Sequence, residues 1–374
     1  MAAAEDLRFV RFADPHAFLE ATKQYDDSFM NFCIGSMYDF IRSPQYAATN
    51  PPPTYLFAIY RGDDLLLTVT GFLRLAVTHN GGTDFAWMMS YPTTAEALLT
   101  GTPTTPGLLA PAIALLAPSV LTALTPDPLV LDKLIGPELP VQAFYAAWSA
   151  LLASRGIRIR LNSANNFGSR VSYATRASLP PPPPTPFPHP VVQATADDLE
   201  ALAQLYIAFQ LDTPWHGVVT RDAALAFMAP HVKAGLVWFA RVDGEPVGYV
   251  LLGRVSPRTI SIRNVFVSTA HRRKGIAEAM VRGVSRYYLN APPHGVQPTH
   301  EGPPAVGYKE EMNLNVADPG AERVYKRSGF LFPDKYGEVV TGGIDPATGR
   351  KAWYASAWLG IERDTDPSPE KQGQ

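Results

Sequence analysis

Cysteine is nearly absent, since the 374-residue sequence contains only Cys33. A single cysteine excludes an intramolecular disulfide framework and any cysteine-based zinc site, and it fits a reducing compartment. Cys33 and the histidines other than His189 and His216 also stand at no spacing typical of metal ligands. We therefore expect no bound metal.

Long hydrophobic runs are absent as well. The longest apolar stretch, from Leu108 to Leu124, is interrupted by proline and hydroxyl residues and falls short of the roughly 20 residues that cross a bilayer. The first residues lack the basic flank and apolar core of a secretory signal. These features predict a cytoplasmic protein without a membrane partner, with the nucleus as the alternative compartment.

The sequence also lacks an excess of basic residues. It has 32 basic and 34 acidic residues and a formal net charge of -2, whereas a protein that binds a nucleic-acid backbone needs a basic surface. Nucleic acid is therefore not an expected partner. Apolar residues make up 46% of the chain, which is typical of a globular protein, and the length exceeds that of one usual core.

Proline, by contrast, is abundant and divides the chain. Eight prolines stand among the twelve residues from Leu179 to Pro190, which favours an extended polyproline II path. We interpret this segment as a semi-rigid linker, with a docking site for a proline-binding partner as the alternative. The expected organisation is a first domain over 1–178, the linker over 179–190, a second domain over 191–362 and a disordered tail over 363–374.

The second domain shows the order β-α-ββ-β-α-β-α-ββ in its apolar pattern. This order predicts an α/β (α+β) domain with a mixed, mostly antiparallel sheet and helices on both faces. Its main expected elements are a helix from Leu199, a hairpin over 236–252, a strand over 259–267, a helix over 275–289, a strand over 312–316, a helix over 319–328, and strands near Val339 and over 353–358.

The first domain repeats this order in a weaker form, which predicts an internal duplication into two tandem lobes. The expected elements are a strand over 8–12, one helix from Pro15 to about Gly35, a hairpin over 55–60 and 65–73, a strand over 85–90, helices over 94–99 and 110–124, a strand over 129–134 and a helix over 141–154.

A loop suited to phosphate follows the strand over 259–267. A pyrophosphate group requires several converging backbone N–H donors, and a helix N-terminus entered through Gly275 supplies them. Gly275 and Ala277 are small, so phosphate oxygens can approach the backbone. Arg272, Arg273 and Lys274 add positive charge for at least one contact to phosphate, with a solvated loop as the alternative. Alone, the hexapeptide Arg272–Ala277 is too common to identify a function.

The segments before and after the hexapeptide make the pattern specific enough to indicate a protein family. The run from Asn264 to Ala277 resembles the signature of the GNAT superfamily of acetyltransferases: a strand, then Arg or Gln-x-x-Gly-x-Gly or Ala, then a helix. A second segment, from Leu314 to Phe330, resembles the strand, turn and helix with Tyr and Gly-Phe that follow in this family. More loosely, the whole chain is similar to two-lobed members with the pattern Phe29-Met30-Asn31-Phe32-Cys33-Ile34-Gly35 in the first lobe.

The resemblance implies roles for individual residues. Phe266 and Val267 would bond the pantetheine arm through exposed strand amides, and residues Arg272, Arg273, Lys274, Gly275, Ile276 and Ala277 would hold the pyrophosphate of acetyl-CoA. Tyr325 would protonate the departing thiolate, or instead pack into the sheet. Asp318 stands where the family usually has Asn near the pantetheine, so its charge puts that contact in doubt.

The acceptor side is less defined. Asp212 and His216 follow the first helix of the second domain, where the family shapes its acceptor pocket, and Asp212 is a candidate catalytic residue, although a local turn or cap explains it as well. Arg263 and Asn264 are polar residues in an apolar strand and are expected to line the pocket. The first domain has no Arg-x-x-Gly-x-Ala loop, so we expect it not to bind CoA.

These features favour an N-acetyltransferase that transfers an acetyl group from acetyl-CoA to a primary amine of a small molecule or peptide by direct attack, because no Ser-His or Cys-His pair suggests a covalent intermediate. One alternative is a CoA-binding sensor or scaffold without turnover. Another is a transferase with a different acyl donor, although the intact phosphate loop favours CoA over a tRNA-borne donor. The acceptor and the oligomeric state stay open.

Overall fold

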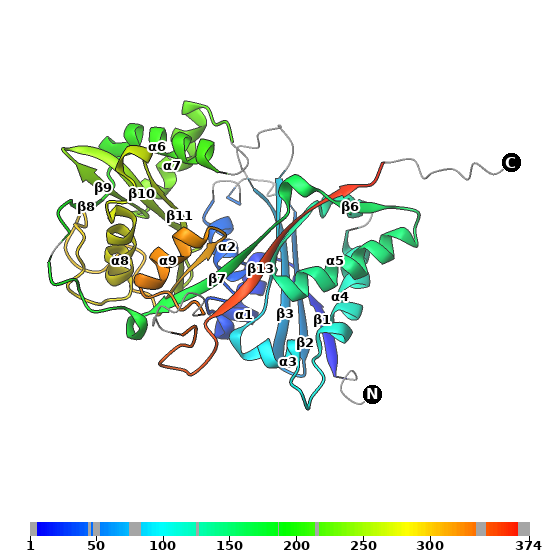
Figure 1. Ribbon diagram of the computed structural model, residues 1–374. Coiled ribbons are helices and arrows are strands. Elements are labelled where there is room, and N and C mark those ends of the chain that lie inside the picture. Colours follow the sequence, from blue (N-terminus) through cyan, green and yellow to red (C-terminus); the bar gives the residue numbers. More distant parts are fainter. Residues whose placement is uncertain are drawn as a thin grey trace.

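One continuous sheet runs through the molecule and joins two lobes (Figure 1). The computed structural model describes residues 6–43, 46–47, 53–74, 84–124, 127–185, 187–213, 217–333 and 342–365. The strand order is β1-β2-β3-β4-β5-β13-β7-β12-β11-β10-β9-β8, and β6 pairs with β13 beside this path. Most neighbours are antiparallel, while β4–β5 and β11–β12 are parallel. The predicted mixed, mostly antiparallel sheet is confirmed.

The sheet alternates with helices along the chain. The strands are β1 (Leu7–Arg11), β2 (Thr54–Arg61), β3 (Asp64–Arg74), β4 (Asp84–Ser90), β5 (Lys133–Pro137), β6 (Ile159–Leu161), β7 (Phe167–Thr175), β8 (Val191–Gln193), β9 (Val237–Val242), β10 (Glu245–Gly253), β11 (Thr259–Val267), β12 (Glu311–Val316) and β13 (Trp353–Arg363). The α-helices are α1 (Pro15–Thr22), α2 (Ile34–Ile41), α3 (Glu96–Thr100), α4 (Leu109–Ala123), α5 (Glu138–Ala153), α6 (Leu199–Asp212), α7 (Arg221–Lys233), α8 (Ile276–Tyr288) and α9 (Pro319–Arg327). None of the helices described is long and apolar enough to span a membrane.

In the second lobe, side chains alternate between two buried layers. Ile260 and Ile262 of β11 pack with Met280 and Val284 of α8, whereas Phe266 belongs to the layer formed with α6 and α7. Successive strand residues point to opposite faces, so helices cover both faces of this part of the sheet. Figure 1 shows α6 and α7 on one side of β9–β11 and α8 and α9 on the other.

The two lobes exchange their last strands. β7 follows α5 of the first lobe but pairs with β12 of the second, for example Asn313 with Tyr173. β13 follows the second lobe but pairs with β5, for example Trp358 with Ile135. The two exchanged strands also pair with each other. The sequence range 191–362 therefore contains a strand that completes the sheet of the first lobe.

Several elements differ from those predicted. The expected helix from Pro15 to Gly35 is broken into α1 and α2, because the loop at Asp26–Ser28 turns its backbone groups toward carboxylates and the second lobe. The strand expected over 129–134 begins only at Lys133, after a turn capped by Asp127. No element was predicted for α7, β6 or β7. Arg363, assigned to a tail, ends β13, and the strand near Val339 lies outside the described residues.

The proline-rich segment lies against α8. The carbonyl oxygen of Pro180 accepts a hydrogen bond from Arg286 at 2.9 Å, and that of Pro181 accepts one from Arg282 at 3.0 Å. Farther along, Phe187 packs on the same apolar cluster as α8. The linker is thus held against the second lobe at Pro180, Pro181 and Phe187.

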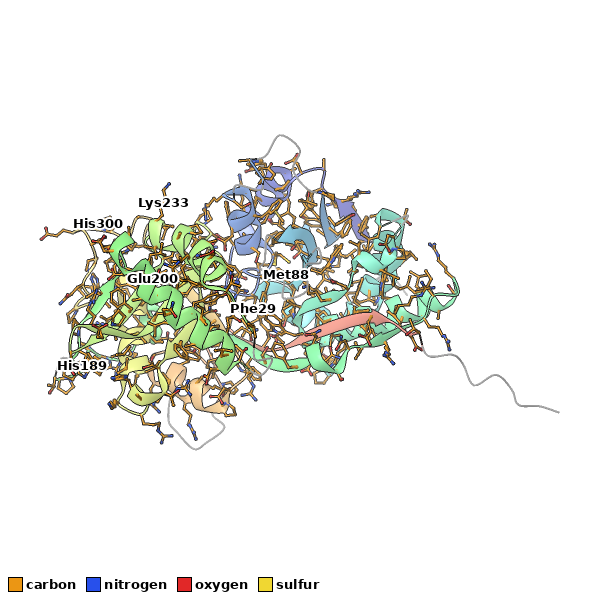
Figure 2. The ribbon with its side chains drawn as sticks, turned by 90° about the horizontal axis from the view of Figure 1, so that it is seen from above. Phe29, Met88, His189, Glu200, Lys233 and His300 are labelled. Atoms are coloured by element: carbon orange, nitrogen blue, oxygen red, sulfur yellow. The ribbon has the colours of Figure 1, made fainter. Side chains whose placement is uncertain are left out.

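The lobes meet through α2 and the loop Asp26–Ser28. Asn31 donates to the carbonyl oxygen of Arg254 at 2.8 Å and to Thr259 Oγ1 at 2.7 Å. A Cβ on Gly35 would lie 2.5 Å from that same carbonyl oxygen, so only glycine allows α2 to approach this closely. Phe29 is fully buried beside Tyr91, Tyr173 of β7 and Tyr354 of β13, near the centre of the molecule in Figure 2. The placement of the two lobes relative to each other therefore depends on this contact.

Candidate active site

The central feature of the site is the point where two parallel strands separate. β11 and β12 pair only from Thr259–Glu311 to Ile262–Leu314. Beyond that point β11 continues to Val267, paired on its other side with β10, and β12 continues to Val316. Backbone groups on the facing edges are thus left open to a ligand. Phe266 and Val267, predicted to bond a pantetheine arm, lie on this segment.

Arg263 marks the start of the separated segment. Leu251 pairs with Asn264 and Leu252 with Ile262, so Arg263 is the extra residue of a β-bulge. Its guanidinium lies 3.9 Å from Asp39 of α2, and both side chains are about one-third exposed, at 32% and 35%. Asp39 is held in turn by the backbone N–H of Arg254 at 2.7 Å. The predicted pocket residue Arg263 is therefore directed toward the first lobe.

The loop after β11 leads into an uncapped helix. Gly275 is the N-cap of α8 with φ +77°, and no side chain caps this helix. The first-turn N–H groups of an α-helix have no intrahelical partner, so those of Ile276, Ala277 and Glu278 are available to an anion. Arg273 also adopts a left-handed conformation, with φ +65°. Strained residues of this kind cluster at ligand sites, where the fold holds the backbone in a binding shape.

The charged side chains of the loop differ in their contacts. Arg272 donates to Asp212 at 2.6 Å and to the Val267 carbonyl oxygen at 3.0 Å, and it lies over the Phe266 ring. Arg273 and Lys274 are exposed and have no ion-pair partner among the described residues. The carboxylate of Glu278 is held by Arg327 at 2.8 Å, which keeps it from capping its own helix.

Asp212 and Arg272 are thus brought together, although they were predicted for different roles. Asp212 is the last residue of α6 rather than part of the following loop. Its ion pair joins the end of α6 to the predicted phosphate loop, Arg272–Ala277. His216, predicted beside it, lies outside the described residues.

Tyr325 lies on α9, partly buried on the apolar cluster that also contacts Val265 and Ala277. Its ring packs against Phe330 at 5.9 Å, edge to face. Burial, and to a smaller extent the charge of Asp318, raises the pKa of its hydroxyl above the ordinary value. The hydroxyl therefore keeps its proton at neutral pH, as a general acid must.

Asp318 is the N-cap residue of α9. Its Oδ1 accepts a hydrogen bond from the Ala321 N–H at 2.7 Å and so caps α9. Aspartate does this as well as asparagine, and Pro319 at the first helical position fits the same junction. This cap accounts for a departure from the family pattern that the sequence left in doubt.

Two polar residues near the separation point were not predicted. Met312, Leu314 and Val316 of β12 pack with α8, so Asn313 and Asn315 point to the opposite face, toward the first lobe. The alternation of Asn with apolar residues in 312–316 could have indicated this polar face from the sequence. The sequence does not show that the face lies against the first lobe, because that arrangement follows from the exchange of β7 and β13.

The corresponding strands of the first lobe, β4 and β5, lie close together at the carboxyl end of β4. β4 and β5 pair at Met88 and Ile135, and a Cβ on Gly136 would lie 2.4 Å from the Met89 carbonyl oxygen. β4 then passes through Tyr91–Pro92 and a short helix before α4 begins. The first lobe thus has no open strand edge next to a glycine-entered helix within the described residues.

Fold and site together define a GNAT-type domain. Residues 202–294, which include β11 and the phosphate loop but end before β12 and α9, match the family model described as Acetyltransferase (GNAT) family. Over these residues the second lobe is similar to the GNAT family of acetyltransferases.

Solved structures similar to the whole chain include two with a similar extent. One is a GCN5-related N-acetyltransferase from Sphaerobacter thermophilus, 14% identical, with 96% of each chain covered and a TM-score of 0.45. The other is a tandem GNAT protein from the clavulanic acid biosynthesis pathway, 12% identical, with 97% of this chain and 99% of that chain covered and a TM-score of 0.46. No curated protein matches the sequence.

Proposed function

We propose that the protein is an N-acetyltransferase that transfers an acetyl group from acetyl-CoA to a primary amine, with one donor site per chain, in the second lobe. The single observation that carries this proposal is the junction of an open strand edge at Phe266 and Val267 with the uncapped N-terminus of α8. This junction offers backbone N–H groups to the pyrophosphate and strand edges to the amide-containing arm of one extended donor.

The residues of this lobe support direct transfer. The neutral amine nitrogen forms a bond to the acyl carbon, the thioester C–S bond breaks, and the sulfur takes a proton from the Tyr325 hydroxyl. The nitrogen releases its own proton to water, and a proton from water returns to the Tyr325 oxygen, which restores its hydroxyl. Arg272, Arg273, Lys274 and the N–H groups of Ile276, Ala277 and Glu278 hold the phosphates. Asp318 acts on the site by fixing the start of α9.

The test is to incubate the full chain with acetyl-CoA and a panel of primary amines. Release of free CoA thiol, together with products heavier by one acetyl group in mass spectrometry, is the expected result. Binding of acetyl-CoA without any acetylated product would instead favour a CoA-binding sensor. Turnover with other acyl-CoA thioesters but not with acetyl-CoA would mean that the donor is a different acyl-CoA.

A pair of glycine variants tests the location of the donor site. Gly275→Glu should abolish acetyl-CoA binding, because the new carboxylate would stand at the phosphate site. Gly156→Glu is the matched control, since Gly156 lies in the first lobe with φ +76°, close to the +77° of Gly275, and has open space around its Cβ position. Equal acetyl-CoA affinity of the two variants in calorimetry would contradict the assignment.

A further inference from the structure

The middle of β11 is open to solvent, although helices cover both faces of the sheet around it. Residues 259–262 and 266–267 are buried, whereas residues 263–265 between them are exposed or half-buried. Ile262 is also the last residue of β11 that pairs with β12. The accessible residues therefore mark an opening in the sheet at the point where the two strands separate.

The opening has two different faces. Val265 and Tyr325, the proposed proton donor to the thiolate, pack against the same apolar cluster as α8. Arg263, the bulge residue, instead faces the first lobe and the helices α6 and α7. Burial is the main cause of the raised pKa of Tyr206 in α6 and of the lowered pKa of His231 in α7, and the charge of Arg263 acts on both groups. An acceptor that approaches from this face therefore meets Arg263.

The guanidinium of Arg263 has unused hydrogen-bond donors. It makes no hydrogen bond within the part of the chain that the structure describes, and its ion pair with Asp39 spans 3.9 Å, which is longer than a hydrogen bond. Asp39 is held without it, since its two oxygens accept bonds from the backbone N–H groups of Arg254 at 2.7 Å and Val255 at 3.3 Å. A guanidinium presents five N–H donors in a planar fork that matches a carboxylate. Arg263 is therefore available to an acidic group of a ligand.

The backbone around Arg263 fixes the place of this cation. Arg263 is the extra residue of the β-bulge, and a bulge next to an active site redirects a side chain. A Cβ on Gly253 would lie 3.2 Å from Arg263 Cγ and 3.5 Å from Asp39 Oδ2. Glycine at this position thus leaves the room in which the two charged side chains lie next to each other.

The two neighbouring charges limit the chemistry of the acceptor. Arg263 attracts an acid, whereas Asp39 beside it repels a simple anion and attracts an ammonium group. A ligand that carries both an acid and an amino group satisfies both side chains at once. Because Arg263 stands at the opening itself, the acid must lie close to the amine that is acetylated. The amine attacks the thioester after it has lost its proton to water.

We propose that the acceptor is an amino acid, whose carboxylate is bound by Arg263 and whose amino group is oriented by Asp39. This inference rests on the proposed function and names the substrate class of the same site. Arg263 is then a specificity-determining residue, and the first lobe contributes to acceptor recognition through Asp39.

The test compares amino acids with their amides, which keep the shape and the amine but lack the acid. The common L-amino acids and β-alanine are each paired with the corresponding amide. For the amino acids that are accepted, kcat/KM should exceed that of the amide at least about tenfold, because the carboxylate forms charge-assisted hydrogen bonds with the guanidinium. An amide group makes a neighbouring amine less basic, so the amides have more free amine and the comparison is not biased toward the acids.

Variants of the two charged residues assign this preference. Arg263→Gln should lower it toward unity through a higher KM for the amino acid, while the acetyl-CoA dissociation constant stays unchanged. Arg263→Lys keeps the charge but not the fork, so it should keep part of the preference. Asp39→Asn should raise the KM of the amides, which carry the amino group without the acid.

Arg241→Gln is the matched control, because Arg241 lies on β9 of the same lobe and is paired with Asp198. It should keep the wild-type preference. A wild-type kcat/KM for amino acids no higher than for their amides, or a preference that Arg263→Gln retains, would overturn the inference. Binding of acetyl-CoA with no acetylation of any amine would overturn the proposed function itself.

Discussion

The two lobes share a strand order but differ at one junction. In the second lobe β11 and β12 separate, and β11 ends at Val267 shortly before Gly275 opens α8. In the first lobe Gly136 keeps β5 against Met89, and α3 and its flanking turns intervene between β4 and α4. We therefore propose the donor site only for the lobe in which the strand edge and the helix N-terminus are both open.

The strand exchange predicts that the lobes do not unfold separately. Tyr354 of β13 is buried against Phe29. Tyr354→Ala should reduce the free energy of unfolding by about 3–5 kcal/mol, as for other buried aromatic residues. In urea titrations, tryptophan fluorescence and acetyl-CoA binding should shift together. A shift of the fluorescence transition alone would show that the lobes are independent.

The second prediction compares tyrosines in equivalent helices. Tyr325→Phe should lower kcat by about 10²-fold, because the departing thiolate loses its proton donor, with no change in acetyl-CoA affinity. Tyr145 stands in α5, the helix of the first lobe that corresponds to α9. Tyr145→Phe should leave kcat unchanged. Equal effects of the two substitutions in steady-state kinetics would remove Tyr325 from the chemistry.

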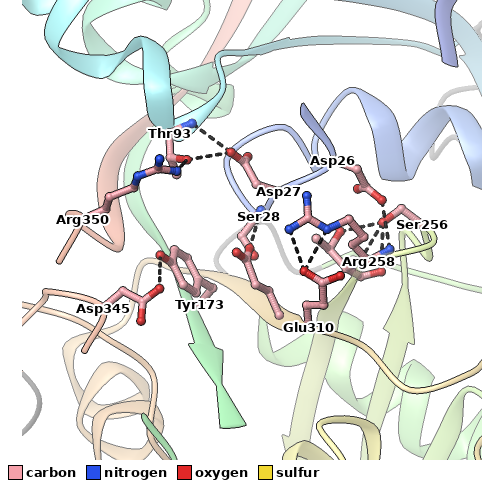
Figure 3. Close-up of polar contacts among 12 residues, drawn as sticks. Asp26, Asp27, Ser28, Thr93, Tyr173, Ser256, Arg258, Glu310, Asp345 and Arg350 are labelled. Carbon is pink, nitrogen blue, oxygen red and sulfur yellow. Dashed lines mark hydrogen bonds and ion pairs between the residues drawn. The ribbon is translucent and has the colours of Figure 1, made fainter. Parts of the chain in front are cut away.

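The third prediction concerns the contact between the lobes at the loop Asp26–Ser28 (Figure 3). Glu311 of β12 accepts a hydrogen bond from the Ser28 N–H at 2.7 Å, and Asp27 accepts bonds from the backbone and hydroxyl of Thr93. Burial, followed by the nearby charge of Asp27, raises the pKa of Glu311 to about 7. The charged form of Glu311 is therefore unfavourable in the folded protein.

The sign of the pH dependence follows from this raised pKa. Below the ordinary pKa of 4.5 both folded and unfolded states hold the proton, and between 4.5 and about 7 only the folded state does. The contribution of Glu311 to stability is thus lost as the pH rises through this window. Relative to wild type, the free energy of unfolding of Glu311→Gln should increase by on the order of 2 kcal/mol from pH 5 to pH 8. The same difference in unfolding free energy between variant and wild type at pH 5 and pH 8, measured in urea, would contradict this prediction.

The smallest effects are expected at the pair of Arg272 and Asp212. Arg272→Ala should weaken acetyl-CoA binding by about tenfold, through loss of one charge-assisted contact to phosphate. Asp212→Ala should leave kcat unchanged and tighten binding slightly, because it frees Arg272 from its ion pair. Calorimetry and initial rates check both. A large fall in kcat for Asp212→Ala would restore Asp212 as the base.

Local sequence patterns predicted the second lobe best. β11 was expected over 259–267 and is found there, and α8 and α9 lie within one or two residues of their predicted bounds, because glycine and proline mark their ends. β7 was missed, since its alternation of small and polar residues is weak and its partner strands are far away in sequence. The polar face of β12 was missed for the same reason: its environment is built by strand exchange.

That exchange also has a consequence for synthesis on the ribosome. The edge of β5 finds its partner only when residues 353–363 have been made. At about 5–20 residues per second, this strand edge waits on the order of 10–45 seconds. During that time the nascent first lobe has an unpaired strand, the kind of edge that recruits other chains. Chaperone dependence during translation would follow directly from the position of β13.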